Sequence, residues 1–407
     1  MSMPTCILLA DDFTGACDTA LQFVRAGLSA RVQIAGVPAG DVDVLVWDTQ
    51  TRNHPAAVAR ARVADAVARL EPFLDRLWYK KVDSTLRGPI GAELEVLLCR
   101  TRRNLCVLAP ALPDAGRTTL AGTHFVDGMP LHRSPASRDP GAPVLHSSIA
   151  DLLASTASLR STVVPLSLVH AGAEALHAGL ARLTGPAVAI VDAQESSDLR
   201  TIAAAAARLD RPPLLCGSAG LAAFIPEAFG LRSQAPRPQA GSSRGRMLLI
   251  LAGSAARHTR QQLDCLHEHL HLHWTVQEIL VAATDAPDGI AARATAGSTA
   301  GSNITILSVP PDEPDPDAAL RTMARAARCC TRDPRLSGIA VTGGTTAIIL
   351  LNELSVGAVN VLESVEAQVP LCRLVDGPAA GLHLITKAGG LGGEDVFVRA
   401  ARRLLPI

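Results

Sequence analysis

The chain has 407 residues, of which 48% are apolar, 19% charged and 3% aromatic, a composition that excludes disordered and fibrous proteins. Its 38 basic and 38 acidic residues give a formal net charge of zero, which argues against partners such as nucleic acid or an anionic membrane. Only three of the basic residues are lysines, and all three, Lys80, Lys81 and Lys387, fall within the motifs described below.

The start of the chain lacks the pattern of a secretory signal. No basic residue precedes its first apolar run, which leads directly into Asp11 and Asp12. No stretch of about 18 apolar residues predicts a membrane-spanning helix. The nine cysteines form no C-x-x-C pair and predict neither a zinc site nor a disulfide framework. We therefore expect a cytoplasmic protein.

Residues 1–232 alternate short runs of Val, Ile and Leu with Ala- and Arg-rich segments of helical period. This alternation is typical of buried parallel strands joined by crossover helices, and it predicts an α/β domain. The predicted strands span 5–10, 42–47, 105–109 and 187–191. The predicted helices span 15–26, 55–70, 90–100 and 196–209.

A linker rich in Pro, Gly, Ser and Arg is predicted over 233–246. A second α/β domain then spans 247–407, with strands over 247–252, 303–308 and 338–342 and a last helix over 395–405. The sequence thus predicts two α/β domains with mainly parallel sheets and an interdomain cleft, where small ligands usually bind.

The first motif is the pair Asp11 and Asp12, which follows the first strand and precedes a Thr14–Gly15 turn into a helix. Ligands bind at the carboxyl ends of strands in open α/β sheets. Two carboxylates there suit magnesium, hydroxyl recognition or general-base chemistry. The alternative is that one Asp caps the helix and the other is solvated.

The second motif, YKKVDSTLRGPIGAE, brings cations, hydroxyls and a helix start together. Such a set suits a carboxylate or phosphate, although a solvated charged loop would have the same composition. Arg52 follows another strand and is expected at the same sheet edge, with a surface position as its alternative. The turn-rich stretch 109–143 is expected to be a lid or binding loop.

Three glycine turns mark the second domain: Gly253–Ser254, Gly343–Thr346 and the cluster around Gly389 that follows Lys387. Turns of this kind present backbone N–H groups at a helix start, where a phosphate is stabilised. One alone could be a plain strand-to-helix connection, but three predict a nucleotide or phosphate site. Neither the P-loop pattern nor the dinucleotide fingerprint occurs in this region.

In combination, ADDFTGACDTA, YKKVDSTLRGPIGAE, APALPDAGRTTLAGTHFVDGMPL, GSAGLA, AGSAARHTRQQL, TGGTTA and TKAGGLGGED resemble the four-carbon acid sugar kinase family. The resemblance runs in order over nearly the whole chain. It implies a two-domain α/β enzyme that transfers the γ-phosphoryl group of ATP, with Mg²⁺, to the terminal hydroxyl of a four-carbon sugar acid. The N-terminal domain would hold the acid and the C-terminal domain ATP.

The resemblance also implies the site residues. The substrate site would comprise Asp11, Arg52, Lys81, Val82, Asp83 and Ser84. The ATP site would comprise Ser254, Gly343, Gly344, Thr345, Thr346 and Gly389. We expect Arg87 to assist substrate binding, and Asp12 or Asp11 to orient or deprotonate the hydroxyl. No metal ligand is assigned.

The KKVDSTLRG form is more similar to the threonate branch of the family, so D-threonate is the expected substrate. D-erythronate and 3-oxo-tetronate are the alternatives within the family. From other classes, a phosphatase would need D-x-D where this chain has Asp11, Asp12 and Phe13, and a periplasmic-type binding protein would need a signal peptide. The expected partners are the small sugar acid and ATP. A homodimer is compatible with the sequence.

Overall fold

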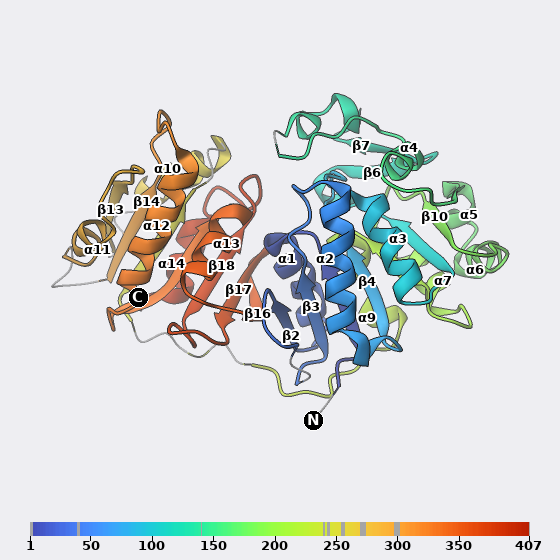
Figure 1. Cartoon of the computed structure of the whole chain (residues 1–407), viewed down its shortest axis with the longest axis horizontal. Coiled ribbons are helices and arrows are strands. Elements are labelled where there is room, and N and C mark those ends of the chain that lie inside the picture. The colour runs from blue at the N-terminus through green and yellow to red at the C-terminus, as the bar shows by residue number, and fades with distance from the viewer. Residues whose placement is uncertain are drawn as a thin grey trace. The chain divides into compact units, whose positions relative to one another are not determined.

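The computed structural model describes residues 3–38, 41–139, 141–238, 241, 245–253, 257–268, 274–296 and 302–406, apart from the side chains of residues 136 and 302. The chain divides into two compact units (Figure 1). Unit 1 comprises Met1–Ala30 and Val37–Pro236, and unit 2 comprises Arg31–Gly36 and Arg237–Ile407. Both are α/β units with mainly parallel strands, so the predicted fold class is confirmed.

Unit 1 contains a parallel sheet with strand order β3-β1-β4-β11-β5-β10-β9. Its strands are β1 (Cys6–Ala10), β3 (Val44–Asp48), β4 (Leu77–Lys81), β5 (Leu105–Ala109), β9 (Ser161–Val164), β10 (Ala187–Val191) and β11 (Leu214–Gly217). In β1, Ala10 pairs with Asp48 on one side and Lys81 on the other. Three carboxyl ends are therefore level, and the residues that follow them meet at one sheet edge.

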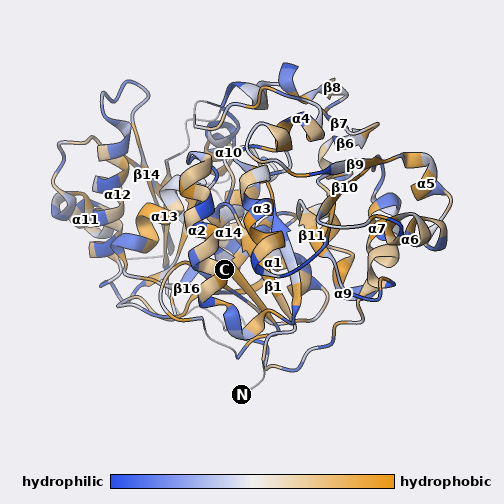
Figure 2. Ribbon diagram, turned by 45° about the vertical axis from the view of Figure 1, so that its right-hand side comes forward, coloured by the Kyte–Doolittle hydropathy of each residue, from blue (hydrophilic) through white to orange (hydrophobic). Residues whose placement is uncertain are grey.

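Helices cover both faces of this sheet because its strands are apolar on both sides. Every residue of β1 and β10 is buried, and Figure 2 shows the hydrophobic colour of strands such as β1 and β11. The longer helices are α1 (Phe13–Arg25), α2 (Ala56–Arg69), α3 (Ile90–Arg100), α6 (Ala173–Ala181) and α7 (Ser196–Ala207); the shorter ones are α4 (Ile149–Ala154), α5 (Leu166–His170), α8 (Ala219–Ala222) and α9 (Ile225–Ala228). Helices α2 and α3 pack on the face that carries Ile7, Leu45 and Trp78.

The stretch predicted as a long lid or binding loop instead contains a three-stranded antiparallel sheet. Its strands are β6 (Arg117–Leu120), β7 (Thr123–Val126) and β8 (Met129–Pro130). The glycines that suggested a loop close tight hairpins, because Gly122 and Gly128 adopt positive φ angles of 69° and 76°. The turn-forming residues of this stretch therefore lie where the chain reverses between the strands of a small sheet.

Unit 2 contains a sheet with strand order β13-β14-β12-β15-β18-β17-β16-β2. Its strands are β2 (Ala30–Gln33), β12 (Met247–Ala252), β13 (Trp274–Leu280), β14 (Ser302–Ser308), β15 (Leu336–Thr342), β16 (Ala358–Glu366), β17 (Val369–Leu374) and β18 (His383–Lys387). The five from β13 to β18 are parallel, and β17 is antiparallel to β18 and β16. Its helices are α10 (Arg257–Glu268), α11 (Pro287–Ala296), α12 (Pro316–Cys330), α13 (Gly344–Glu353) and α14 (Val396–Leu404).

One short segment of the first half of the chain belongs to unit 2. Arg31–Gly36 leaves unit 1 and adds β2 beside β16. There the Arg31 Nε donates to Asn360 Oδ1 at 2.9 Å, and the Ile34 N–H donates to the Gly357 carbonyl at 2.8 Å. This exchange could not be predicted, because the residues of a four-residue strand do not indicate which sheet it joins.

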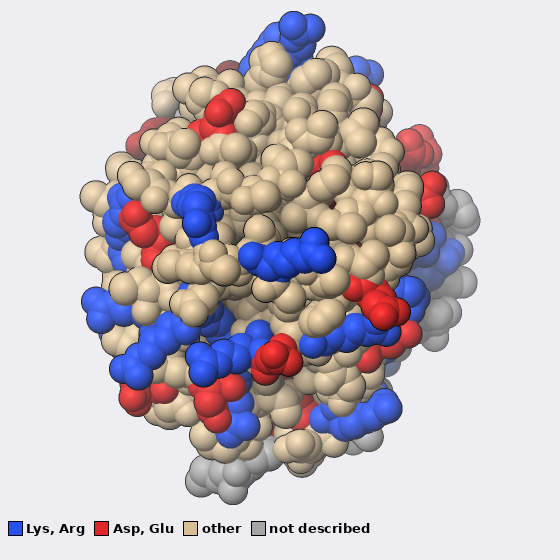
Figure 3. All heavy atoms as spheres, turned by 90° about the vertical axis from the view of Figure 1, so that its right-hand side faces the viewer, with Lys and Arg blue, Asp and Glu red and all other residues tan. Residues whose placement is uncertain are grey.

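No helix of the described part of the chain is long and apolar enough to cross a membrane. Figure 3 shows one face of the molecule, on which lysines and arginines are interspersed with acidic residues. Charges of both signs on one face agree with the formal net charge of zero.

Candidate functional site

Asp12 serves as the N-cap of α1. Its backbone is extended, and its carboxylate accepts hydrogen bonds from the Gly15 N–H at 3.1 Å and the Thr14 hydroxyl at 2.6 Å. The capping alternative is therefore correct for Asp12. For Asp11 the solvated alternative is wrong, because this residue is only 2% exposed.

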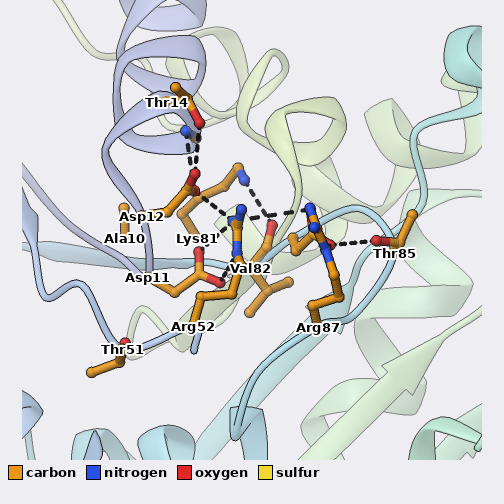
Figure 4. A network of polar contacts seen from close by, with 12 residues as sticks. Ala10, Asp11, Asp12, Thr14, Thr51, Arg52, Lys81, Val82, Thr85 and Arg87 are labelled. Carbon is orange, nitrogen blue, oxygen red and sulfur yellow. Dashed lines mark hydrogen bonds and ion pairs between the residues drawn. The ribbon is translucent and has the colours of Figure 1, made fainter. Parts of the chain in front are cut away.

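Arg52 joins the two aspartates, as Figure 4 shows. Its Nε and one terminal nitrogen donate to the two carboxylate oxygens of Asp11 at 2.8 and 3.0 Å, and the same terminal nitrogen also bonds Asp12. Burial by itself would raise the pKa of Asp11, but the Arg52 guanidinium, helped by Lys80 and Lys81, holds it below its ordinary value. Arg52 thus occupies the site and not the surface.

Lys81 reaches the cluster from the end of β4. Its side chain is buried, and its ammonium donates to the Val82 carbonyl at 2.8 Å. Gly15 lies directly beside it, since a Cβ at that position would come within 2.9 Å of the Lys81 Nζ and 2.5 Å of an Asp12 oxygen. An ammonium has three donors, and one bond to a carbonyl suits a position where an anionic ligand completes the set.

Asp83 and Arg87 form the other end of the network. The Arg87 guanidinium donates to both Asp83 oxygens at 2.6 and 3.2 Å and to Asp139 at 2.6 Å. Burial opposes ionisation of Asp83, but Arg52, 3.9 Å away, and Arg87 hold its pKa well below the ordinary value. Arg87 therefore orders Asp83, and the solvated-loop alternative is wrong for this segment.

Ser84 lies next to Asp83 and is partly exposed. Its carbonyl faces the Nε2 of His124, on β7, at 2.9 Å. His124 is fully buried, and burial lowers its pKa to about 4, so its ring is neutral at physiological pH. The small sheet of β6, β7 and β8 thereby supports the loop that carries Asp83 and Ser84.

Two acidic residues near the cluster were missed in the sequence. Asp48, the last residue of β3, is 2% exposed, and burial together with the Asp12 charge raises its pKa well above the ordinary value. Burial also raises the pKa of Asp18, on α1, to about 6, against the opposing effect of Lys81. The available signal was spacing, since Asp18 lies one helical turn after Thr14 on the same face.

The three glycine turns of unit 2 follow the neighbouring strands β12, β15 and β18, so the structure brings them to one sheet edge. Gly343, with φ of 98°, caps α13, whose first turn comprises Gly344, Thr345 and Thr346. A Cβ at Gly253 would collide with the Thr346 hydroxyl, so these two turns are closely apposed. Ser254 lies outside the described residues.

Lys387 brings a cation to this edge. It is 2% exposed, and its Nζ lies 3.3 Å from both the Thr342 hydroxyl and the Gly389 carbonyl. Burial lowers its pKa to about 8. A buried ammonium at the end of a strand that pairs with the strand leading into α13 is an arrangement that suits phosphate.

Helix α10 holds the third glycine turn in shape. The Gln262 amide donates to the carbonyls of Gly392 and Gly393, both at 3.0 Å, and His258 Nε2 lies 2.7 Å from the Gly392 carbonyl. Gln262 is fully buried. Neither side chain was predicted, because their partners are backbone atoms 130 to 134 positions away in the sequence.

Family models match both parts of the chain. A sugar-binding N-terminal domain matches residues 6–225, and a nucleotide-binding C-terminal domain matches residues 249–397. The chain is 34% identical to a D-threonate kinase of Cupriavidus necator, with 95% of each chain covered. It is 30% identical to a 3-oxo-tetronate kinase of Pseudomonas fluorescens, covering 97% of this chain and 96% of that one.

Solved structures share the fold. A Haemophilus influenzae protein of a domain family of unknown function aligns with a TM-score of 0.78 at 23% identity, over 98% of this chain and all of that one. A Bordetella bronchiseptica protein of the same domain family, solved with bound citrate as a domain-swapped dimer, aligns with a TM-score of 0.51 at 30% identity. The alignment covers 99% of this chain and 98% of the Bordetella bronchiseptica chain.

Proposed function

Since the chain belongs to the four-carbon acid sugar kinase family, we propose that it transfers the γ-phosphoryl group of ATP to the terminal hydroxyl of a four-carbon sugar acid, with D-threonate as the preferred substrate. The observation that carries the proposal is the cluster of Asp11, Asp12, Arg52 and Lys81 at the sheet edge of unit 1, in which Asp11 and Lys81 are buried and Asp12 and Arg52 are partly exposed. Cations suit the carboxylate of a sugar acid, and carboxylates suit its hydroxyls. The similarity to D-threonate kinases supports the choice of acid.

Binding of the acid falls to Arg52, Lys81 and Ser84, with Val82 and Asp83 at its border. Within the described part of the chain the Lys81 ammonium makes one hydrogen bond, to the Val82 carbonyl, which leaves donors for the acid, while Arg52 is already oriented by Asp11. Arg87 acts one step back, because its guanidinium is committed to Asp83 and Asp139. These residues would fix the carboxylate end of the acid and direct its far hydroxyl toward the reacting phosphoryl group.

Asp12 is the better candidate for the base. Both oxygens of Asp11 are bound by Arg52 and its side chain is 2% exposed, whereas the Asp12 side chain is 17% exposed. A carboxylate that accepts a hydroxyl proton must be reachable by that hydroxyl. Asp11 would then hold Arg52 in place while Asp12 orients and deprotonates the terminal hydroxyl.

The nucleotide site would comprise Gly343, Gly344, Thr345, Thr346 and Gly389, with Lys387 beside them. These residues fit the phosphates of a nucleotide, because the N–H groups at the start of α13 and the buried Lys387 ammonium supply hydrogen-bond donors and positive charge. Magnesium bound to the ATP phosphates would neutralise the charge that develops during transfer. Ser254 stays a predicted contributor.

The test is a coupled assay of ADP release from MgATP with D-threonate, L-threonate, D-erythronate and 3-oxo-tetronate. We expect the highest kcat/KM with D-threonate, and NMR of the product should place the phosphate on the terminal oxygen. Activity only with D-erythronate or 3-oxo-tetronate would correct the substrate. Absence of ADP with every acid, together with phosphate release from a phosphorylated acid, would indicate a phosphatase and contradict the proposal.

Lys387 predicts a pH dependence of ATP binding. Its pKa of about 8 means that the ammonium is charged at pH 7 and mostly neutral at pH 9, so we expect KM for ATP to rise about tenfold between these values. Loss of folding would not explain this rise in KM. Lys387 has a higher pKa in the unfolded chain than in the folded one, so its contribution to the free energy of unfolding increases as the pH rises from about 8 to 10.5.

The measurement is KM for ATP at pH 6.5 to 9.5, with the sugar acid saturating. Lys387→Arg is the matched control, because a guanidinium keeps its charge throughout this range and should flatten the profile. An equal rise in KM in both proteins would show that another group is responsible.

The remaining predictions concern partners and location. A homodimer finds support in the domain-swapped Bordetella bronchiseptica dimer, and sedimentation analysis would test it. A cytoplasmic location, and function without nucleic acid or membrane partners, stay predictions from the sequence.

A further inference from the structure

Lys80 and Glu93 form a buried ion pair beside the proposed substrate site. The Lys80 Nζ lies 3.1 Å from a Glu93 oxygen, and the two side chains are 0% and 1% exposed. Burial raises the pKa of Glu93 although Lys80 opposes this. A fully buried pair is costly to desolvate and adds little net stability, so its presence calls for a reason other than stability.

A chain of hydrogen bonds leads from this pair to the segment that carries Arg52. The second Glu93 oxygen accepts the Thr51 hydroxyl, which lies 2.8 Å from the Thr49 hydroxyl. Thr49 in turn donates to the Ala10 carbonyl at 2.7 Å. Every side chain in this chain is buried, so water does not compete for its bonds.

The backbone of the same segment is tied to the end of β1. The N–H groups of Thr51 and Arg52 both donate to the Asp11 carbonyl, at 3.0 and 3.2 Å. Thr51 is therefore fixed by Asp11 through its backbone and by Glu93 through its side chain. The position of the Arg52 backbone, and hence of its guanidinium, depends on both anchors.

The two adjacent lysines point to opposite faces of β4, as alternation along a strand requires. Lys81 faces Gly15 of α1 within the site, whereas Lys80 faces Glu93 of α3 behind it. The two lysines therefore have different roles, Lys81 within the site and Lys80 in the ion pair with Glu93.

We propose that Lys80 and Glu93 are positioning residues, which act through Thr51 to hold Arg52 where it binds the carboxylate of the sugar acid. Neither needs to touch the substrate. The inference rests on the proposed function, because it concerns binding of the acid and not of ATP.

The experiment compares the wild type with Lys80→Met/Glu93→Gln. The double substitution removes both charges of the pair together, so neither is left buried alone. It also replaces the charged acceptor of the Thr51 hydroxyl by a neutral amide that no longer has the Lys80 ammonium to orient it, which weakens the link to the Arg52 segment. We expect KM for the sugar acid to rise at least tenfold, KM for ATP to stay within twofold, and the melting temperature to stay within a few degrees. A purely structural role would move the melting temperature and not separate the two KM values.

Thr51→Val provides a second, independent variant. It keeps the Lys80–Glu93 pair and removes the hydroxyl that links this pair to the Arg52 segment. The same selective rise in KM for the sugar acid is expected, and this variant decides the question should the double variant fail to fold.

Arg60→Met/Glu95→Gln is the matched control, since it neutralises a partly exposed ion pair of 2.9 Å that joins α2 to α3, the helix that also carries Glu93. Its KM values should equal those of the wild type. Unchanged KM for the sugar acid in a folded Lys80→Met/Glu93→Gln or Thr51→Val variant overturns the inference. A wild type that is inactive with every tetronate overturns the proposed function instead, and with it the premise of this inference.

Discussion

Asp12→Asn is expected to lower kcat by about a thousandfold while the protein stays folded, because general-base catalysis contributes about 10²- to 10⁴-fold. Asparagine keeps an oxygen that can accept the Gly15 N–H and the Arg52 guanidinium, as Asp12 Oδ1 does. The Thr14 hydroxyl can accept a hydrogen bond from the new amide group in place of donating. The substitution therefore removes the proton acceptor and preserves the helix cap.

The measurements are kcat with both substrates saturating and the melting temperature. Asp315→Asn is the matched control, since Asp315 caps α12 in unit 2 with a similar bond of 2.9 Å to the Ala318 N–H. It should leave kcat unchanged. A kcat above a tenth of the wild-type value in Asp12→Asn would exclude Asp12 as the base and leave Asp11 as the candidate.

Much of this site could be predicted because parallel strands end at one sheet edge. Asp11, Arg52 and Lys81 are far apart in the sequence, but each closely follows or ends a run of apolar residues that predicts a buried strand. In the second unit, the glycine turns predicted a nucleotide or phosphate site, and the structure brings Gly343 and Gly389 to one sheet edge because β15 and β18 are neighbouring strands. Strand ends and the rule for ligand position are local features that a single sequence records.

The rest could not be predicted because it depends on pairings between distant segments. Nothing local shows that Glu93 on α3 faces Lys80, or that Gln262 binds the carbonyls of Gly392 and Gly393. The capping role of Asp12 also shifted the start of α1 from the predicted Gly15 to Phe13. Supporting residues are thus harder to predict than the residues they support, because their partners are set by packing.

Arg52→Ala is expected to raise KM for the sugar acid at least a hundredfold and to destabilise unit 1 by about 3 kcal/mol, the usual cost of breaking a buried ion pair. The substitution removes a ligand for the substrate carboxylate and leaves Asp11 buried without its bidentate partner. Against the effect of burial, the Arg52 guanidinium makes the largest contribution to holding the pKa of Asp11 below its ordinary value, and Lys80 and Lys81 add to it. In the variant, we expect burial to outweigh the two remaining lysines and to raise this pKa.

The sign of this pKa change makes the loss of stability depend on pH. In the wild type, the lowered pKa of Asp11 contributes stability above the unfolded value of about 4, and this contribution disappears as the pH falls. In Arg52→Ala the raised pKa means that the folded state loses stability as the pH rises through this range. The difference in unfolding free energy between the two proteins should therefore be larger at pH 7 than at pH 4, as urea denaturation can measure.

Arg69→Ala is the control for loss of an arginine, because its ion pair with Asp65 is exposed to solvent. Such pairs contribute at most about 1 kcal/mol, so this variant should keep the wild-type KM and show no comparable pH effect. Arg52→Lys should recover only part of the function, since an ammonium cannot form the parallel bonds to both Asp11 oxygens. Equal stability losses at pH 4 and pH 7 in Arg52→Ala would contradict the ion-pair explanation, because a packing defect alone does not titrate.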